Sequence, residues 1–393
     1  MTEILGYERQ SGPPGIRNIV ASIHTVECSS FVSQQIASMH PRIHALGFPG
    51  CYRNDYAARL MTALGTHPNV GAVLLLSLGC EGTDAAAMAD SIRASGRPVE
   101  VLRIQECGGT MPTIEQGRAL AGRMLAELDR TPRVPMAISD LVVGTECGGS
   151  DATSGIAANP AVGHAFDLLV DAGGTAIIEE TLEMVGCASV VAARGANPEV
   201  SHQLHAAVEK AENFSLQIDQ FSIAPGNHEG GLTTIEEKSM GAFAKCGTRP
   251  IQGVIKVAQR PPGNGLYVLD SVPDPYPFLF GYSNPNDSEG ILDLISCGAH
   301  LVAFTTGRGS VIGSVISPVV KVCGNPKTYA RMSGDMDVNA GRVMTGEATL
   351  AEVGREIFEL MLRVAAGEST KSEALGHREY FIPYKVQDLC ANV

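Results

Sequence analysis

The sequence predicts an α/β fold of two α/β domains, with mostly parallel sheet layers and flanking helices. Apolar runs of strand length alternate with helical patterns along the chain, and this alternation is typical of parallel sheets whose crossovers are helices. The chain has 393 residues, of which 44% are hydrophobic and 18% charged, enough to bury a sizeable core. We expect an N-terminal domain over residues 1–150, carrying cysteine-bearing strand ends, and a C-terminal domain over 151–393 with glycine-rich substrate loops.

The first part of the chain is expected to hold four strands and three helices. The apolar runs place the strands at 19–26, 70–78, 99–104 and 137–143, and the helices at 31–39, 84–94 and 113–129. In a parallel sheet, ligands collect at the carboxyl ends of the strands. The residues that follow these four runs are therefore the first candidates for a site.

The second part continues the alternation with longer loops. The elements expected there are helix 161–172, strand 175–178, helix 198–217, loop 225–231, helix 232–245, strand 253–257, strand 301–304, loop 305–314 and helix 350–366. An irregular stretch over 270–287 carries Pro273, Pro275, Pro277 and Pro285. Clustered prolines break regular elements, so this stretch is expected to be a surface loop or a lid.

Charge and cysteine usage exclude several classes of partner. The net charge is −13, from 29 basic and 42 acidic residues, and the chain has no basic run, so nucleic acid and anionic membranes are excluded as expected partners. The longest apolar run, at 70–78, is too short to cross a bilayer. No secretory signal is visible at the N-terminus, and ten cysteines then indicate a reducing, cytoplasmic location.

Each of the four predicted strands of the first part ends in a cysteine beside a carboxylate. These pairs are Glu27-Cys28, Cys80-Glu81, Glu106-Cys107 and Glu146-Cys147. If the strands are parallel neighbours, their thiols meet at one edge of the sheet. No CxxC spacing is present, which argues against a zinc ribbon or a thioredoxin motif. Cys187, Cys246, Cys297 and Cys390 are expected to be small buried apolar residues.

The segment Gly144–Gly155 is the strongest candidate for a site. It follows a strand and combines Cys147 and Asp151 with several glycines and hydroxyls, among them Ser150. Glycine lets backbone amides approach a ligand, and amides with hydroxyls suit an oxyanion. An elaborate turn is the alternative, but turns rarely need a cysteine and an aspartate together.

Three further segments have both a functional and a structural interpretation. In 226–238, Gly231 precedes a helical run whose amides could bind an anion, and Thr234 and Lys238 share a helix face; a capped helix with a solvated charge pair explains the pattern equally well. In 304–310, a glycine-flanked Arg308 could clamp a carboxylate or pair with a structural aspartate. On pattern alone, residues 12–18 are an ordinary surface turn. The sequence contains no nucleotide-binding motif.

These segments together resemble the altronate dehydratase/galactarate dehydratase family, which also contains the large subunit of sulfolactate sulfo-lyase. The match runs in order over nearly the whole chain. Its matching pieces are Gly6-Tyr7, Gly15–Asn18, Thr25–Cys28, Gly79–Glu81, Cys147–Asp151, Ser154–Pro160, Gly230–Thr234, Glu237–Ser239, Phe304–Ser310 and Asp335–Asn339.

The resemblance implies a lyase, usually iron-dependent, that eliminates water from a sugar acid or related 2-hydroxy carboxylate to give a 2-keto-3-deoxy acid. The alternatives are release of sulfite from sulfolactate, and a non-catalytic binding paralogue. The metal candidates are Cys28, Cys80 and Cys147, with Cys51 behind them, because thiolates suit Fe²⁺ or an Fe–S cluster. Many members carry an N-terminal SAF-type domain, whereas the family core here begins at Gly6, so we expect a separate small SAF-type subunit and a homo-oligomer.

The resemblance also implies residue roles. Lys238 is the preferred base, with Asp151 and His228 as rivals, and Arg17 and Arg308 are the candidate carboxylate clamps. The expected substrate-binding residues are Arg17, Asn18, Ser150, Thr233, Thr234, Arg308 and Ser310. The sequence departs from the family at several places: residues 46–51 lack the usual histidines, Ser11 and Pro13 replace an acidic and a basic residue, His228-Glu229 stands where Lys-Ala is common, and Ala340 replaces a common cysteine. These departures motivate the binding-only alternative.

Overall fold

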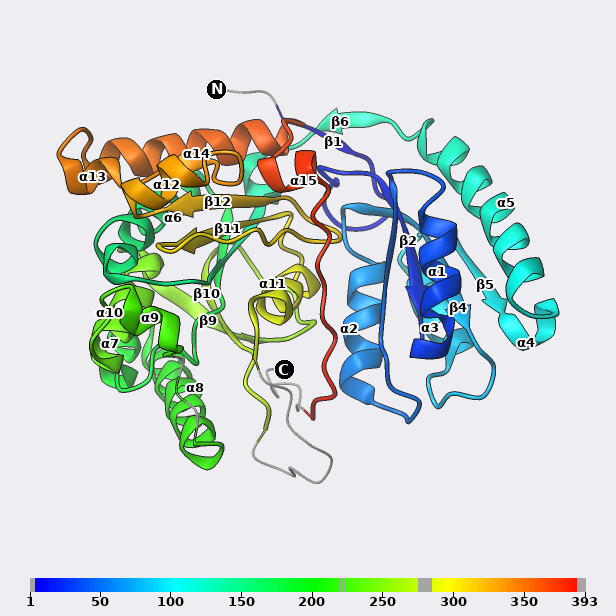
Figure 1. Ribbon diagram of the computed structural model, residues 1–393, viewed down its shortest axis with the longest axis horizontal. Coiled ribbons are helices and arrows are strands. Elements are labelled where there is room, and N and C mark those ends of the chain that lie inside the picture. The colour runs from blue at the N-terminus through cyan, green and yellow to red at the C-terminus, as the bar shows by residue number, and fades with distance from the viewer. Residues whose placement is uncertain (1–3, 220, 222, 275–284, 387–393) are drawn as a thin grey trace.

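The computed structural model describes residues 4–219, 221, 223–274 and 285–386. Two parallel sheets, each flanked by helices, form two domains that lie beside one another (Figure 1). The two-domain α/β prediction is confirmed. Within the described ranges, no helix has both the length and the apolar character needed to cross a membrane.

The first domain contains a four-stranded sheet in the order β3-β2-β4-β5, with every pair parallel. Its strands are β2 (Ile19–His24), β3 (Ile43–Gly47), β4 (Val70–Ser77) and β5 (Val99–Arg103). Its main helices are α1 (Ser30–Ala37), α2 (Asp55–Gly65), α3 (Ala85–Ala94) and α5 (Thr110–Leu128). All residues of β2 and β4 are buried, as expected for central strands that helices cover on both faces.

The second domain contains a seven-stranded sheet in the order β13-β12-β11-β7-β8-β10-β9, also parallel throughout. Its strands are β7 (Val142–Cys147), β8 (Thr175–Ile178), β9 (Ile251–Lys256), β10 (Gly265–Asp270), β11 (Leu301–Thr306), β12 (Val319–Cys323) and β13 (Val338–Asn339). Its longer helices are α6 (Asn159–Asp171), α8 (Pro198–Gln217), α10 (Ile235–Phe243), α11 (Asp287–Ser296) and α14 (Leu350–Ala365). A short antiparallel pair, β1 (Leu5–Tyr7) with β6 (Arg133–Pro135), precedes it.

The fourth predicted strand was wrong in position and in partner. Residues 138–140 form a 3₁₀ turn, and β7 begins only at Val142. β7 pairs with β8 and β11 of the seven-stranded sheet, not with the strands of the first domain. The expectation that four strand ends share one sheet edge is therefore wrong. An apolar run predicts that a strand is buried, but it does not predict which strands pair with it.

The irregular proline-rich stretch is only partly within the described residues. Pro275 and Pro277 lie outside them, so the lid prediction falls mostly on residues that the structure does not describe. At one end β10 continues to Asp270, and at the other α11 begins at Asp287 with Asn286 as its N-cap. Both elements were missing from the sequence prediction.

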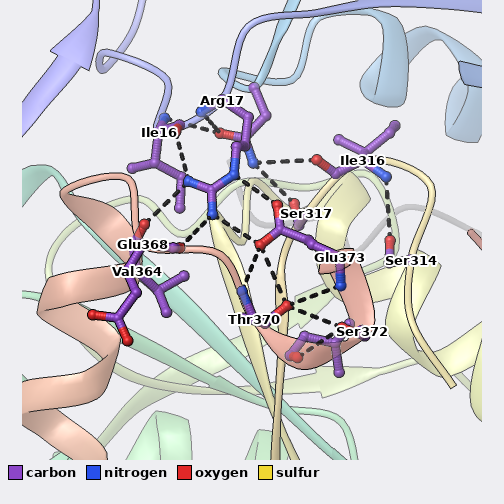
Figure 2. A network of polar contacts seen from close by, with 12 residues as sticks. Ile16, Arg17, Ser314, Ile316, Ser317, Val364, Glu368, Thr370, Ser372 and Glu373 are labelled. Carbon is purple, nitrogen blue, oxygen red and sulfur yellow. Dashed lines mark hydrogen bonds and ion pairs between the residues drawn. The ribbon is translucent and has the colours of Figure 1, made fainter. Parts of the chain in front are cut away.

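Arg17 joins the two domains through a network that uses all five of its N–H donors (Figure 2). Its Nε and Nη2 donate to the two carboxylate oxygens of Glu373, at 2.7 and 2.9 Å. The other three bonds go to the backbone carbonyls of Ile16, Val364 and Glu368. Glu373 lies in α15 (Lys371–Leu375), near the C-terminal end of the chain. The planar guanidinium thus fixes the 12–18 turn against the second domain.

We predict that Arg17→Ala lowers the free energy of unfolding by about 2–4 kcal/mol, because it removes the cation that pairs with the partly buried Glu373 carboxylate and one donor from each of three carbonyls. Arg17→Lys keeps the charge but not the planar fork, so it should recover only part of this loss. Urea unfolding followed by circular dichroism measures both.

The control is Arg363→Ala, whose exposed ion pair with Glu368 has both side chains more than 40% exposed. Its loss should stay within about 1 kcal/mol. Equal, small losses in the Arg17 and Arg363 variants would contradict a joining role for Arg17.

Candidate functional site

A cavity of about 570 Å³ opens at the carboxyl edge of the seven-stranded sheet. Residues that follow β7, β8, β10 and β11 form its wall, together with the start of α11. This is the edge at which parallel α/β sheets bind ligands. The titratable side chains on the wall are Glu146, Cys147, Glu179, Glu183, Lys238, Asp287, Glu289, Asp293, Arg308 and Lys385.

Three of the four segments that the sequence singled out meet at this cavity. The Gly149 carbonyl accepts the backbone amide of Arg308 at 2.8 Å. The Asn227 side-chain amide donates to the Ser150 carbonyl at 2.8 Å, and Arg308 Nη1 donates to the Gly226 carbonyl at 2.6 Å. The loops after β7 and β11 and the segment before α10 thus form one continuous wall.

Gly148 and Gly149 allow this close approach. A Cβ added to Gly148 would lie 1.9 Å from Oδ2 of Asp287, so no side chain fits between β7 and the start of α11. Gly149 has a φ of +61°, the left-handed conformation that glycine adopts without strain. Gly148 therefore leaves room for the Asp287 carboxylate at the end of β7, and Gly149 leaves room for the loop that carries Arg308.

Arg308 presents a partly exposed guanidinium to the cavity. Its Nη2 lies 3.1 Å from a Glu229 carboxylate oxygen, and the two side chains are 39% and 69% exposed. An ion pair this exposed is weak. The Arg308 guanidinium is therefore held only weakly by Glu229 and is accessible to an anion in the cavity.

Lys238 also lies on the cavity wall, on α10. The threonines before it do not line the cavity. Thr234 is the N-cap of α10 and accepts the Glu237 amide at 3.2 Å, while the Thr233 amide and hydroxyl donate to the Glu237 carboxylate. Both threonines therefore start the helix, which is the capping interpretation of that segment.

Asp151, His228 and Ser310 make local contacts instead of lining this cavity. Asp151 is buried, and its carboxylate accepts from the Thr153 amide and hydroxyl and from the Asn325 side chain. His228 Nδ1 contacts the Leu232 carbonyl at 3.0 Å, and the Ser310 hydroxyl accepts the amide of residue 312 at 3.2 Å. Asp151 thus holds the loop together.

Arg17 and Asn18 lie at the domain junction, not at the cavity. All donors of Arg17 are already used, as described above. Asn18 is buried, and its amide donates to the Leu128 carbonyl and accepts from Arg9. The substrate-binding interpretation of these two residues is corrected to a structural one. Of the predicted substrate-binding residues, Ser150 and Arg308 line the cavity.

The predicted cysteine ligands are divided between the two domains. Cys28, Cys51 and Cys80 are exposed and follow β2, β3 and β4, whereas Cys147 is buried at the end of β7. Among the residues that the structure describes, no three His, Cys, Asp or Glu side chains gather as metal ligands. The expectation that Cys28, Cys80 and Cys147 assemble into one site is therefore wrong, because β7 lies in the other sheet.

Cys147 is a neutral thiol in this environment. Its sulfur donates to a Glu180 carboxylate oxygen at 3.5 Å and accepts the Ser150 hydroxyl at 3.4 Å. Burial, and then the Glu180 charge, raise the pKa of this thiol to about 12. Cys187, Cys246 and Cys297 are buried as predicted, and Cys390 lies outside the described residues.

Sequence reasoning missed a buried carboxyl pair at the floor of the cavity. Burial, followed by the charge of Glu179, raises the pKa of Glu146 well above its ordinary value, so Glu146 carries a proton and donates it to Glu179. A Cβ on Gly290 would lie 2.4 Å from Oε2 of Glu146, so α11 needs a glycine there. Glu179 follows β8 directly, and the strand-end rule that selected Glu146 could have found it.

Two buried lysines balance the charge beneath the cavity. The ammonium of Lys245 forms an ion pair with Glu180, and neither side chain is exposed to solvent. Lys385, from the C-terminal segment, lies 2.6 Å from Glu289 and 3.4 Å from Asp293, and donates to the Ser271 carbonyl. Carboxylates can stay this deeply buried only when such cations accompany them.

Asp287 is a partly exposed carboxyl on the cavity wall that is suited to proton transfer near neutral pH. It is half-buried as the first residue of α11. Burial and the nearby Glu183 raise its pKa to about 6, while the Lys238 charge opposes the shift. A carboxyl with a pKa near the working pH can serve as a general acid.

Two family descriptions match the chain. Residues 6–129 match "D-galactarate dehydratase/Altronate hydrolase, second domain", and residues 138–387 match "D-galactarate/Altronate dehydratase, C-terminal". The (2R)-sulfolactate sulfo-lyase subunit beta of Chromohalobacter salexigens is 36% identical over 392 residues, 96% of each chain. An altronate dehydratase of Bacillus subtilis is 30% identical over 96% of this chain and 76% of its own. The galactarate dehydratase (L-threo-forming) of Escherichia coli is 34% identical over 79% of this chain and 59% of its own.

We predict that iodoacetamide modifies Cys28, Cys51 and Cys80 in the native protein and spares Cys147. Only the accessible thiolate reacts, and Cys147 is both buried and protonated, so its rate should be at least ~100-fold lower. Peptide mapping by mass spectrometry measures each site. The same peptide from urea-unfolded protein is the control and should be labelled fully, whereas native labelling of Cys147 at the rate of Cys80 would show that the thiol is a thiolate.

Proposed function

The chain belongs to the D-galactarate/altronate dehydratase family, and from that premise we propose that it is a lyase that eliminates water from a sugar acid or related 2-hydroxy carboxylate. The observation that carries this proposal is the meeting of Arg308, Lys238 and Asp287 around one cavity. A cation for the carboxylate, a base and an acid are the three groups that such an elimination requires.

Substrate binding is assigned to Arg308 and Ser150. The guanidinium exchanges its exposed partner Glu229 for the substrate carboxylate, which it can hold with two parallel hydrogen bonds. The Ser150 side chain lies on the same wall. The anchored carboxylate then directs C2 and C3 of the substrate toward the space between Lys238 and Asp287.

Proton removal at C2 is assigned to Lys238. Its amine takes the C2 proton and becomes an ammonium, and the C2–H electrons enter the carboxylate to give an enediolate. The added negative charge then lies between the Arg308 guanidinium and the new Lys238 ammonium, which stabilise it electrostatically. Both side chains are fixed on the cavity wall before the reaction.

Loss of the hydroxyl at C3 is assigned to Asp287. The enediolate electrons form the C2–C3 double bond, the C3–O bond breaks, and the protonated Asp287 gives its proton to the departing hydroxyl, which leaves as water. The product is an enol that tautomerises to a 2-keto-3-deoxy acid. The pKa of about 6 keeps a protonated fraction of Asp287 near neutral pH.

Iron is the cofactor that the resemblance implies, but the described residues do not fit a cysteine-bound iron site. Cys147 is the one cysteine among the described residues that line the cavity, and no three candidate ligands gather in the described ranges. The steps above therefore use only groups of the chain itself.

A second candidate function is release of sulfite from a sulfolactate. It is favoured by the 36% identity to the sulfo-lyase subunit beta over 96% of both chains. Removal of the C2 proton would be the same step in this reaction. Sulfite would then leave without a proton from Asp287, because the negative charge of the sulfite ion is already spread over the oxygens of the ion. The subunit name of this relative supports a multi-subunit assembly. We propose that this chain likewise assembles with a small SAF-type subunit and forms a homo-oligomer.

A cytoplasmic location is supported by nine free thiols among the described cysteines.

We predict that Lys238→Met abolishes exchange of the substrate C2 proton with deuterated water and leaves the fold intact. The assay follows exchange by proton NMR with altronate, galactarate and sulfolactate in turn. The matched control is Lys327→Met, which removes an exposed lysine from α12 (Pro326–Arg331). Wild-type exchange in Lys238→Met would assign the base elsewhere, and turnover of any substrate excludes the binding-only alternative.

We predict that loss of the C3 hydroxyl slows as the pH rises through the Asp287 pKa of about 6. The acid is the protonated form, so the rate of dehydration relative to the rate of C2 proton exchange at the same pH should fall about tenfold for each pH unit above that value. Asp287→Asn should lose at least ~100-fold in rate and lose this limb of the pH profile. Asp171→Asn, at an exposed ion pair with Arg249, is the control and should keep both. A sulfo-lyase should instead show sulfite release that survives Asp287→Asn.

A further inference from the structure

A second cavity, of about 430 Å³, lies at the amino edge of the seven-stranded sheet. Val142 and Thr175, the first residues of β7 and β8, line it together with the loop after β9 that carries Arg260. The turn at 12–14 of the first domain closes it on another side. Cys147 lies five residues along β7 from Val142, so the cavity at the other edge is about 16 Å away along the strand.

Two arginines beside this cavity share one hydrogen-bond acceptor. Arg260 Nη2 donates to the Thr66 carbonyl at 3.0 Å, and Arg97 Nη2 donates to the same oxygen at 3.4 Å. Arg97 is only 4% exposed. A third, Arg9, donates to the carbonyl of Pro68, which lines the cavity.

No carboxylate within the described ranges forms an ion pair with any of these three arginines. The acceptors of Arg97 are the carbonyls of residues 66, 70 and 95, and those of Arg9 are the carbonyls of residues 8, 17 and 68 and the Asn18 side chain. Burial lowers the pKa of both Arg9 and Arg97, and repulsion adds to the shift, from Arg97 at Arg9 and from Arg260 at Arg97. Guanidinium groups stay charged in proteins, so the repulsion persists in the folded state. In a chain with a net charge of −13, this cluster is a local excess of positive charge.

The other titratable groups around the cavity do not neutralise this excess. His300 contacts the Pro14 carbonyl and accepts the Val142 amide, and burial lowers its pKa to about 4, so it is neutral. His67 is also neutral, because burial and then His300 lower its pKa well below the ordinary value. Asp140 lines the cavity, with its carboxylate accepting the amide of residue 137, and one acid does not balance three cations.

Gly12 brings a backbone turn against the exposed arginine. Its φ is +80°, and an added Cβ would lie 3.1 Å from Nη1 of Arg260. The turn at 12–18, which the proposed elimination does not use, therefore forms a wall of this cavity next to the guanidinium.

We propose that this cavity binds a small oxyanion, of the phosphate or carboxylate type, with Arg260 as its exposed ligand and Arg97 and Arg9 supplying the positive field. The bound anion bridges Arg260 of the second domain to the turn at Gly12 of the first. It thereby braces the domain junction, on the opposite edge of the sheet from the proposed catalytic groups.

The test is titration calorimetry with inorganic phosphate and, separately, malonate, at constant ionic strength in chloride. Wild-type protein should bind at least one of the two saturably, and the tighter one identifies the class of oxyanion. Arg260→Gln should weaken that binding at least tenfold. The matched control is Arg118→Gln, an exposed arginine that likewise donates to a single backbone carbonyl, that of Gln35; it should bind as wild type.

Arg308→Gln removes the proposed carboxylate clamp of the other cavity, and the part of the binding that depends on Arg260 should persist in this variant. Loss of binding in Arg308→Gln with retention in Arg260→Gln would overturn the proposal, as would the lack of saturable binding to the wild type. If Arg260→Gln does not fold, crystals of the wild-type protein soaked in selenate decide the matter. An anomalous peak beside Arg260 supports the site, and peaks found only elsewhere overturn it.

Discussion

The buried ammonium of Lys385 is the contact on which the cavity floor, the C-terminal segment and the domain junction all depend. It lies 2.6 Å from Glu289 and 3.4 Å from Asp293 of α11. From the first domain, Tyr56 donates to Asp293 at 2.9 Å and places its ring 5.3 Å from the ammonium. Asn54 donates to the Lys385 carbonyl. The C-terminal segment therefore runs between the two domains (Figure 1), because the buried carboxylates of α11 need a cation at this point.

The same electrostatic rule organises the rest of the cavity. Where a lysine reaches a buried carboxylate, as Lys245 reaches Glu180, an ion pair forms. Where none does, as for Glu146, a proton supplies the compensation and the pKa rises. Asp287 lies nearer the solvent, and its pKa is raised less, to about 6, than that of the paired Glu180, which is raised to about 8. Burial thus shifts the carboxyls of the floor most, and the proposed general acid lies at the rim.

The two edges of the seven-stranded sheet carry side chains of opposite charge. Carboxylates gather at the carboxyl edge, where β7 and β8 each end beside a glutamate. At the amino edge lie arginines for which the described residues supply no carboxylate partner, and two of them, Arg97 and Arg260, share the Thr66 carbonyl. Because every strand of this sheet runs in the same direction, the loops that follow the strands lie at one edge of the sheet, and the loops that precede the strands lie at the other. A parallel sheet thus separates two polar sites by the length of one strand.

The sequence by itself determined the class of fold, many of its elements and three of the segments that build the site. Helix 198–217 and strand 175–178 have the limits that the sequence predicts. The capping residue and periodicity of the helix, and the apolar run of the strand, lie within the segments themselves, so no distant residue is needed to predict them. The loops around Gly149, Asn227 and Arg308 were recognisable for the same reason, since their glycines and polar side chains are unusual in any scaffold. The family followed from the order of these motifs.

Only the tertiary structure decided which strands are neighbours and therefore which side chains share a site. The sheet that β7 joins separates Cys147 from Cys28 and Cys80, and the path of α11 brings Asp287 to Gly148. Arg17 was assigned to a substrate because a guanidinium suits any carboxylate, and the fold supplies Glu373, 356 residues away, instead. Pairing of strands and neutralisation of buried charge are set by partners far apart in the chain, and a local pattern carries no information about them.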